Sequence, residues 1–161
     1  MQNDTFTFST GITVQLRRVS PFLVSEIDRV FPEPEPPTQE VVIDGETKIE
    51  ANPADPSYLQ QMAKHRQETV ERKMNYILKR GVIADEHEMT AAVDAVRKHW
   101  RAEFGAELQE QDLLLAYIQY VCVGSPDDLG DLMNAIQMRS KPTEGGIAAE
   151  AKSFQGAVQR A

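Results

Sequence analysis

The sequence has little of what catalytic and metal-binding proteins use. Its 161 residues include a single cysteine, Cys122, and three histidines. One cysteine excludes a disulfide within the chain and a CxxC pair, and its apolar neighbours predict a buried, unreactive thiol. Gly-rich phosphate loops and G-x-S-x-G motifs are also missing. We therefore predict a protein that is not an enzyme and that binds no cofactor and no metal.

The nearest approach to a metal-ligand cluster is the run Asp85-Glu86-His87-Glu88. Four adjacent side chains do not converge on one point, and no second His or Cys lies nearby in the sequence. Carboxylates at the start of a helix interact favourably with its dipole. We therefore interpret this run as a solvated helix start.

Long apolar runs and an excess of basic residues are missing too. No stretch approaches the roughly 18 apolar residues of a membrane span, and the first ten residues do not resemble a signal peptide. The chain has 17 Lys and Arg against 25 Asp and Glu, a net charge of −8. Because nucleic-acid binding requires Lys and Arg to neutralise phosphates, we predict no nucleic-acid partner. From the missing apolar run and signal peptide we predict no membrane association and a cytoplasmic location.

What the sequence does have is a proline-rich stretch from Phe31 to Leu59, with a strand–turn–strand pattern at its centre. Prolines fix φ and remove backbone donors, so the run PEPEPP is predicted to be an extended spacer. Asp44-Gly45, between two β-prone runs, predicts a hairpin with a two-residue turn. A lone two-stranded hairpin is only marginally stable in water. The stretch is therefore either a flexible linker or an arm that docks on a partner.

If the stretch docks, its apolar side chains are the candidates for partner contact. They belong to the hairpin and to the start of the helix that follows it: Val41, Ile43, Ile49, Tyr58 and Leu59. The surrounding residues are acidic, since residues 1–57 contain ten acidic and four basic residues. The linker interpretation needs none of these contacts, because acidic Pro-rich runs are common in linkers.

The rest of the chain predicts an α+β protein, mainly α, with a small N-terminal hairpin region followed by a helical bundle. Alternation over residues 5–16 indicates a hairpin that turns at Ser9-Thr10-Gly11. Ser20-Pro21 is typical of a helix start, and Pro32 ends that helix. The predicted divisions are residues 1–31 (hairpin and helix), 32–56 (Pro-rich arm), 57–139 (bundle) and 140–161 (flexible tail).

Four helices are predicted in the bundle. The first is capped by Ser57 and followed by Gly81 as its C′ residue. The second begins at Asp85 or Thr90, ends at Gly105 and carries Trp100 as a core anchor. The third is apolar nearly all round, so it is expected in the middle of the bundle or in an interface. The fourth begins at Ser125-Pro126. The third helix is predicted to run from Asp112 to Val123. The apolar stripe of the second helix consists of Met89, Val93, Val96, Trp100 and Phe104.

The order of features in the first half of the chain is similar to that of a known family. A short hairpin precedes a helix that ends in a P-x-P-x-P-P run (Phe31–Pro37), and an N-P-x-D-P-x-Y-L segment (Asn52–Leu59) enters a long charged helix. Looser similarity extends from Phe6 to Ile83. In this order the chain resembles the tail assembly chaperones of long-tailed, siphovirus-like bacteriophages. The shared motifs are structural rather than catalytic.

The resemblance implies a non-enzymatic chaperone in the cytoplasm of the host cell. Its partner would be the tape measure protein, kept soluble during tail assembly, with the tail tube protein and a second copy of the chain as further partners. Such chaperones are generally absent from the finished particle. The alternative is a structural virion component, a head–tail connector or tail accessory subunit, whose Pro-rich arm contacts neighbouring subunits by strand addition.

Overall fold

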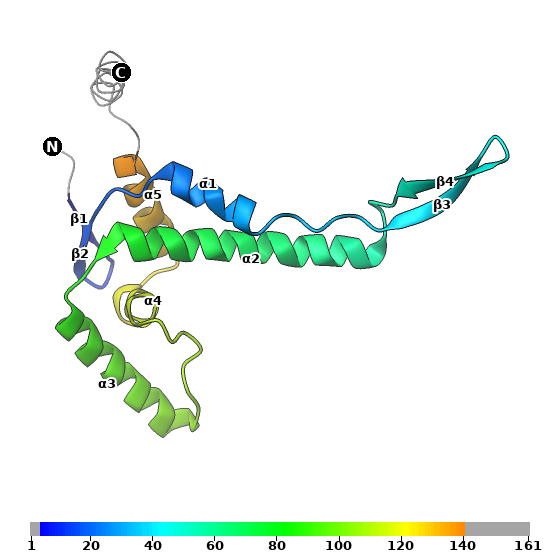
Figure 1. Ribbon diagram of the computed structural model, residues 1–161. Coiled ribbons are helices and arrows are strands. Elements are labelled where there is room, and N and C mark those ends of the chain that lie inside the picture. The colour runs from blue at the N-terminus through cyan, green and yellow to red at the C-terminus, as the bar shows by residue number, and fades with distance from the viewer. Residues whose placement is uncertain (1–3, 141–161) are drawn as a thin grey trace, which may run out of the picture. The chain divides into compact units, whose positions relative to one another are not determined.

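The computed structural model describes residues 4–140, and these form two compact units (Figure 1). Unit 1 contains the described residues up to Ser20 and those from Ile77 onwards, and unit 2 is Pro21–Tyr76. The predicted α+β, mainly α class is confirmed. Unit 1 joins two stretches that are distant in the sequence, whereas the predicted divisions were consecutive. Apart from Ser140, the predicted C-terminal tail lies outside the described residues.

Unit 1 contains a small antiparallel sheet in the order β1-β2-β5. The predicted N-terminal hairpin is confirmed, and Gly11 at its turn has a φ of 85°, a conformation that favours glycine. Val14 and Leu16 are both buried in the core while Thr13 and Gln15 are exposed, as period-two alternation predicts. The third strand, which pairs Val82 with Leu16, was not predicted because two residues carry no periodicity. The strands are β1 (Thr5–Thr7), β2 (Thr13–Leu16) and β5 (Val82–Ile83).

Local signals in the sequence place both ends of α3, and they place the later helices of unit 1 only in part. Asp85 caps α3, since its Oδ1 accepts a hydrogen bond from the Glu88 N–H at 2.9 Å, and Gly105 closes that helix with a φ of 63°. The third predicted helix is capped by Asp112 but changes to a π-helical turn midway. The fourth begins at Asp128, three residues after the predicted start. The elements are α3 (Glu86–Phe104), α4 (Leu113–Tyr117), η1 (Ile118–Cys122) and α5 (Asp128–Ser140).

The core of unit 1 forms around α4 and η1, as expected for the helix that is apolar nearly all round. Ile118 is 1% exposed, and the side chains of Cys122, Leu132 and Ile136 are fully buried. Burial raises the pKa of the Cys122 thiol to about 11, so the thiol is protonated and unreactive at neutral pH. The prediction of a buried cysteine is confirmed.

The prediction that Trp100 anchors the core is wrong. The apolar stripe of α3 is buried only at its beginning, at Met89 and Val93. Towards the end of the helix Trp100 is 39% exposed and Phe104 is 61% exposed, and their rings contact each other at a centroid distance of 4.4 Å. The apolar stripe extends beyond the part of α3 that packs against the core. Helical periodicity alone does not show where this packing ends.

The role of Gly81 also differs from the prediction. It is the last residue of α2 (Pro56–Gly81), and its backbone is not among the described glycines with positive φ. A Cβ atom at this position would lie 2.7 Å from Cγ2 of Ile136, a buried side chain of α5. Glycine is therefore needed for the close approach of α5, and not to reverse the chain after the helix.

Buried Asp128 joins the turn of the first hairpin to the start of α5. Its carboxylate accepts hydrogen bonds from the Ser9 hydroxyl at 2.7 Å and from the backbone N–H groups of Ser9, Gly124 and Ser125. These hydrogen bonds, with the Ser9 hydroxyl as the largest contributor, hold the pKa of Asp128 well below its usual range. The carboxylate connects residues more than a hundred positions apart in the sequence.

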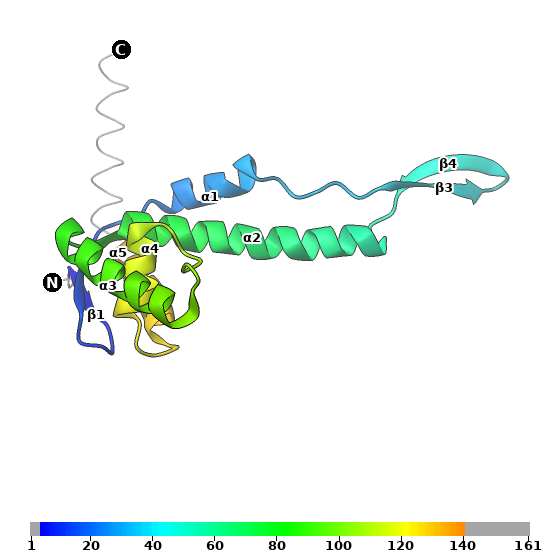
Figure 2. The ribbon, with the colours of Figure 1, turned by 90° about the horizontal axis from the view of Figure 1, so that it is seen from below.

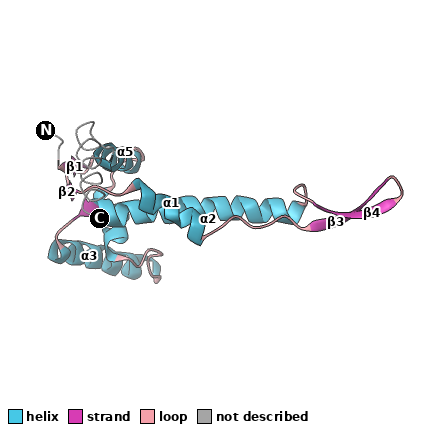
Figure 3. Ribbon diagram, turned by 45° about the horizontal axis from the view of Figure 1, so that its top comes forward, coloured by secondary structure: helices cyan, strands magenta, loops and turns pink. Residues whose placement is uncertain are grey.

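Unit 2 consists of a short helix, an extended segment, a hairpin and most of α2 (Figure 3). The helix starts and ends as Ser20-Pro21 and Pro32 predict. Asp55, not Ser57, caps α2, because its Oδ1 accepts hydrogen bonds from the backbone N–H groups of Ser57 and Tyr58. The elements other than α2 are α1 (Pro21–Val30), β3 (Thr38–Ile43) and β4 (Glu46–Ala51).

Candidate functional site

The predicted hairpin is present, and its turn explains its register. Asp44 and Gly45 have φ values of 54° and 82°, so both central residues are left-handed, as a type I′ turn requires. The turn pairs Ile43 with Glu46, and the ladder continues to Thr38 opposite Ala51. The strands are longer than the predicted runs at both outer ends. Figure 1 shows β3 and β4 beyond the end of α2, with no other element of unit 2 beside them.

The hairpin places the predicted contact residues on opposite faces. Side chains alternate along a strand, so Val41 and Ile43 share one face, with Lys48 and Glu46 opposite them. Ile49 lies on the other face, where it is 72% exposed and diagonal to Val42, which is 70% exposed. The set predicted from the sequence is therefore not one surface within the hairpin.

Tyr58 and Leu59 do not belong to the hairpin and lie in the first turn of α2. Leu59 is exposed and Tyr58 is partly buried. Together, the five predicted residues occupy the two hairpin faces and one helix start. Whether they bind a partner stays a prediction.

Helix α1 also carries exposed apolar side chains, and these were not among the contact residues predicted from the sequence. None of the ten residues of this helix is buried, and Phe22 is 81% exposed. Isolated helices this short are marginal in water, and most helical stability in proteins comes from packing of the apolar face. The sequence contained a signal for this exposed surface, since prolines at both ends confine the apolar residues to a short helix. The exposed apolar side chains of α1 and the residue after it are Phe22, Leu23, Val30 and Phe31.

Polar contacts hold the end of α1 beside α2 (Figure 2). Lys73 Nζ lies 2.7 Å from the Asp28 carboxylate, and the Arg72 guanidinium lies 4.2 Å from the centre of the Phe31 ring. Exposed ion pairs and cation–π contacts each contribute about 1 kcal/mol or less. Contacts of this strength orient α1 while leaving its apolar side chains open to solvent.

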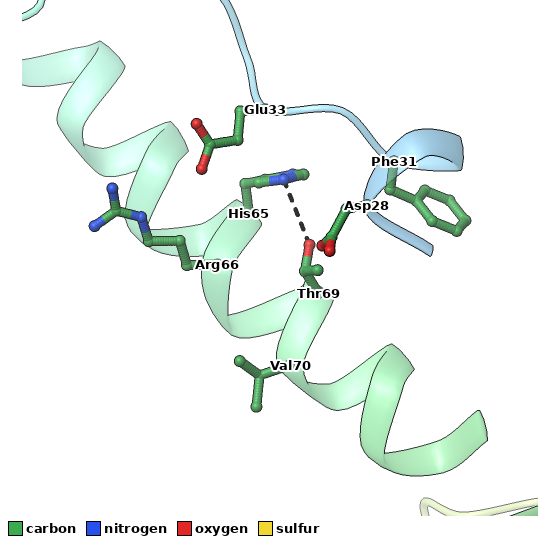
Figure 4. Close-up of a pocket in the computed structure, with 7 residues that line it drawn as sticks. All are labelled: Asp28, Phe31, Glu33, His65, Arg66, Thr69 and Val70. Carbon is green, nitrogen blue, oxygen red and sulfur yellow. Dashed lines mark hydrogen bonds between the residues drawn. The ribbon is translucent and has the colours of Figure 1, made fainter. Parts of the chain in front are cut away.

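A cavity of about 430 Å³ lies between the end of α1, the segment after it and the middle of α2. Figure 4 shows the carboxylates of Asp28 and Glu33 on either side of the His65 ring, which is 3.4 Å from the buried Thr69 hydroxyl. Carboxylates beside apolar side chains can accept hydrogen bonds from a Lys or Arg side chain while its methylene groups contact the apolar surface. The cavity is lined by Asp28, Phe31, Glu33, His65, Arg66, Thr69 and Val70.

Residues 4–140 contain no group of three or more His, Cys, Asp or Glu side chains placed to hold a metal ion. Within the same range, no helix is both long and apolar enough to cross a membrane. The apolar helix Asp112–Val123, one of the surfaces that could have faced a partner, is instead largely buried in unit 1.

The protein is α+β, mainly α. Its unit 2 carries exposed apolar side chains and a hairpin that forms a two-stranded sheet. Comparisons with models of protein families, with curated proteins and with solved structures each find no match. The function of the protein is therefore inferred from the residues of this chain.

Proposed function

We propose that the protein is a non-enzymatic tail assembly chaperone, which binds the tape measure protein in the host cytoplasm and keeps it soluble while the tail is built. The observation that carries the proposal is the exposed apolar side of α1, above all Phe22 at 81% exposure. An apolar stripe of this kind can pair with an apolar stripe of a long helical client. The sequence motifs Phe31–Pro37 and Asn52–Leu59 supply the resemblance to phage proteins.

A carboxylate in the cavity beside α1 supports the same function. The cavity beside α1 offers the Glu33 carboxylate to basic side chains of a client, whereas Asp28, which also lines it, is already paired with Lys73. Apolar contact with α1 should supply most of the binding energy, so raising the salt concentration should weaken client binding only slightly.

We expect Phe22→Asp to reduce the soluble fraction of a co-expressed tape measure protein severalfold. The substitution replaces the most exposed apolar side chain of the proposed contact by a charge, and because Phe22 is exposed it should leave the fold unchanged. The measurement is the soluble fraction of the client after co-expression, with the circular dichroism of the variant as a folding check.

The matched control is Gln61→Asp, which adds the same charge at an exposed position of α2, outside α1. It should leave client solubility near the wild-type level. Equal client solubility with the wild type, Phe22→Asp and Gln61→Asp would contradict a role for α1.

The second candidate function, a structural virion component, is favoured by one observation. Within residues 4–140, β3 and β4 pair only with each other, so each strand has one edge open to strand addition by a neighbouring subunit. Mass spectrometry of purified particles separates the two functions. A chaperone should be missing from the particles, and a connector should be present in fixed copy number.

A further inference from the structure

The outer edge of β4 is set by the register of the hairpin. The N–H of Asn52 donates to the Pro37 carbonyl oxygen at 2.7 Å, so this pair is hydrogen-bonded. In an antiparallel ladder hydrogen-bonded and non-bonded pairs alternate. The pairs that contain Glu50, Lys48 and Glu46 are therefore bonded to β3. The alternate residues of β4 direct their N–H and C=O groups to the open edge: Thr47, Ile49 and Ala51.

Lys48 has no carboxylate partner within the hairpin. It is the single basic residue between Phe31 and Leu59, and the residue opposite it on β3 is Val41. None of the ion pairs among the described residues involves Lys48. Glu46 and Glu50 share its face on the same strand, as side chains two residues apart do.

We propose that a second copy of this chain pairs with the open edge of β4, antiparallel and with the two-fold axis at Ile49. In this register Ile49 lies opposite Ile49 of the other copy, and Thr47 lies opposite Ala51. These are the residues whose backbone groups face outwards, so the edges form hydrogen bonds with each other. Lys48 of each copy then lies opposite Glu50 of the other, which gives two cross-strand ion pairs related by symmetry.

Other registers of the hairpin edges fit less well. An axis at Thr47 would also oppose Lys48 and a glutamate, Glu46, but it overlaps only the turn end of the strand. On the open edge of β3, an axis at Glu40 would place Glu40 opposite its own copy, and like charges directly opposite are destabilising. Charge and overlap therefore select β4 as the edge and Ile49 as the centre.

Pairing through β4 removes the weakness of the isolated hairpin. Two strands alone are marginal in water, whereas three or more strands with an apolar face can be stable. The dimer has a four-stranded sheet in the order β3-β4-β4-β3. Val42 and Ile49 of both copies lie on one face of that sheet. The inference concerns the hairpin and does not depend on which client the protein binds.

Charge reversal in the full-length chain tests the proposal, with sedimentation equilibrium over a range of concentrations as the measurement. We expect wild type to dimerise, and Lys48→Glu or Glu50→Lys to raise the dimer dissociation constant about tenfold or more, because two attractive pairs become repulsive. The double variant should recover the dimer. An equimolar mixture of the two single variants should form heterodimers, since both ion pairs are then restored.

Glu46→Lys is the matched control, because it reverses a charge on the same face of the same strand. In the proposed register Glu46 lies beside Asn52 of the other copy, so this variant should still dimerise. A wild-type chain that stays monomeric at every concentration would overturn the proposal. Disruption by Glu46→Lys but not by Glu50→Lys would overturn the register.

Cross-linking supplies a second, independent readout. Opposed residues of a bonded pair have Cα atoms about 5.5 Å apart, within disulfide range. We expect Ile49→Cys to form an intermolecular disulfide on mild oxidation, and Val42→Cys, equally exposed but on β3, to do so far more slowly. The native Cys122 is buried and does not compete. Equal rates for the two variants would contradict the pairing.

Discussion

Replacing Ile118 by Asp is expected to unfold unit 1 at temperatures where the wild-type protein is stable. Ile118 is 1% exposed and lies in η1, at the centre of the core. An unpaired charge at such a position costs several kcal/mol, on the order of the whole stability of a small domain. Thermal unfolding followed by circular dichroism measures the effect.

Two control variants separate the buried charge from other changes at this site. Gln119→Asp places the same charge on the exposed neighbouring residue and should leave the melting temperature nearly unchanged. Ile118→Val removes one methylene group and should cost about 1 kcal/mol. If the Ile118→Asp variant has the same melting temperature as the wild type, η1 is not the centre of the core.

The second large effect is expected from Asp128→Ala, which removes the acceptor of every hydrogen bond between α5 and the Ser9 turn described above. The N–H groups of Gly124 and Ser125 then lose their partner in a part-buried site, and leaving donors unsatisfied is costly. We expect a clear decrease in melting temperature. Asp127→Ala, at an exposed carboxylate one residue earlier, should have a much smaller effect.

The contribution of Asp128 should also depend on pH. Its pKa is lowered in the folded protein, so its stabilising contribution is present above the unfolded pKa of about 4 and decreases as the pH falls below that value. The difference in melting temperature between wild type and Asp128→Ala should therefore narrow on acidification below about pH 4. A difference that is constant from pH 7 to pH 3 would show that the ionised carboxylate is not what stabilises the turn.

The candidate site was partly accessible from the sequence. The two-residue turn at Asp44-Gly45 already implies that Ile43 pairs with Glu46, so the separation of Val41 and Ile49 onto opposite faces follows from residue counting. The exposure of Phe22 does not follow in the same way. An amphipathic helix predicts an apolar face, but which surface covers that face, if any, depends on the packing of the whole chain.

The sequence by itself determined the local structure of this protein: the turns at Gly11 and Asp44-Gly45, the end of α3 at Gly105 and the boundaries of α1. These depend on the backbone preferences of one or two residues, which act without distant partners. Only the tertiary structure decided that Trp100 lies partly in solvent, that Gly81 admits Ile136 and that Asp128 binds the Ser9 turn. Each of these depends on residues brought together from distant parts of the chain, and local periodicity and propensity carry no information about such pairs.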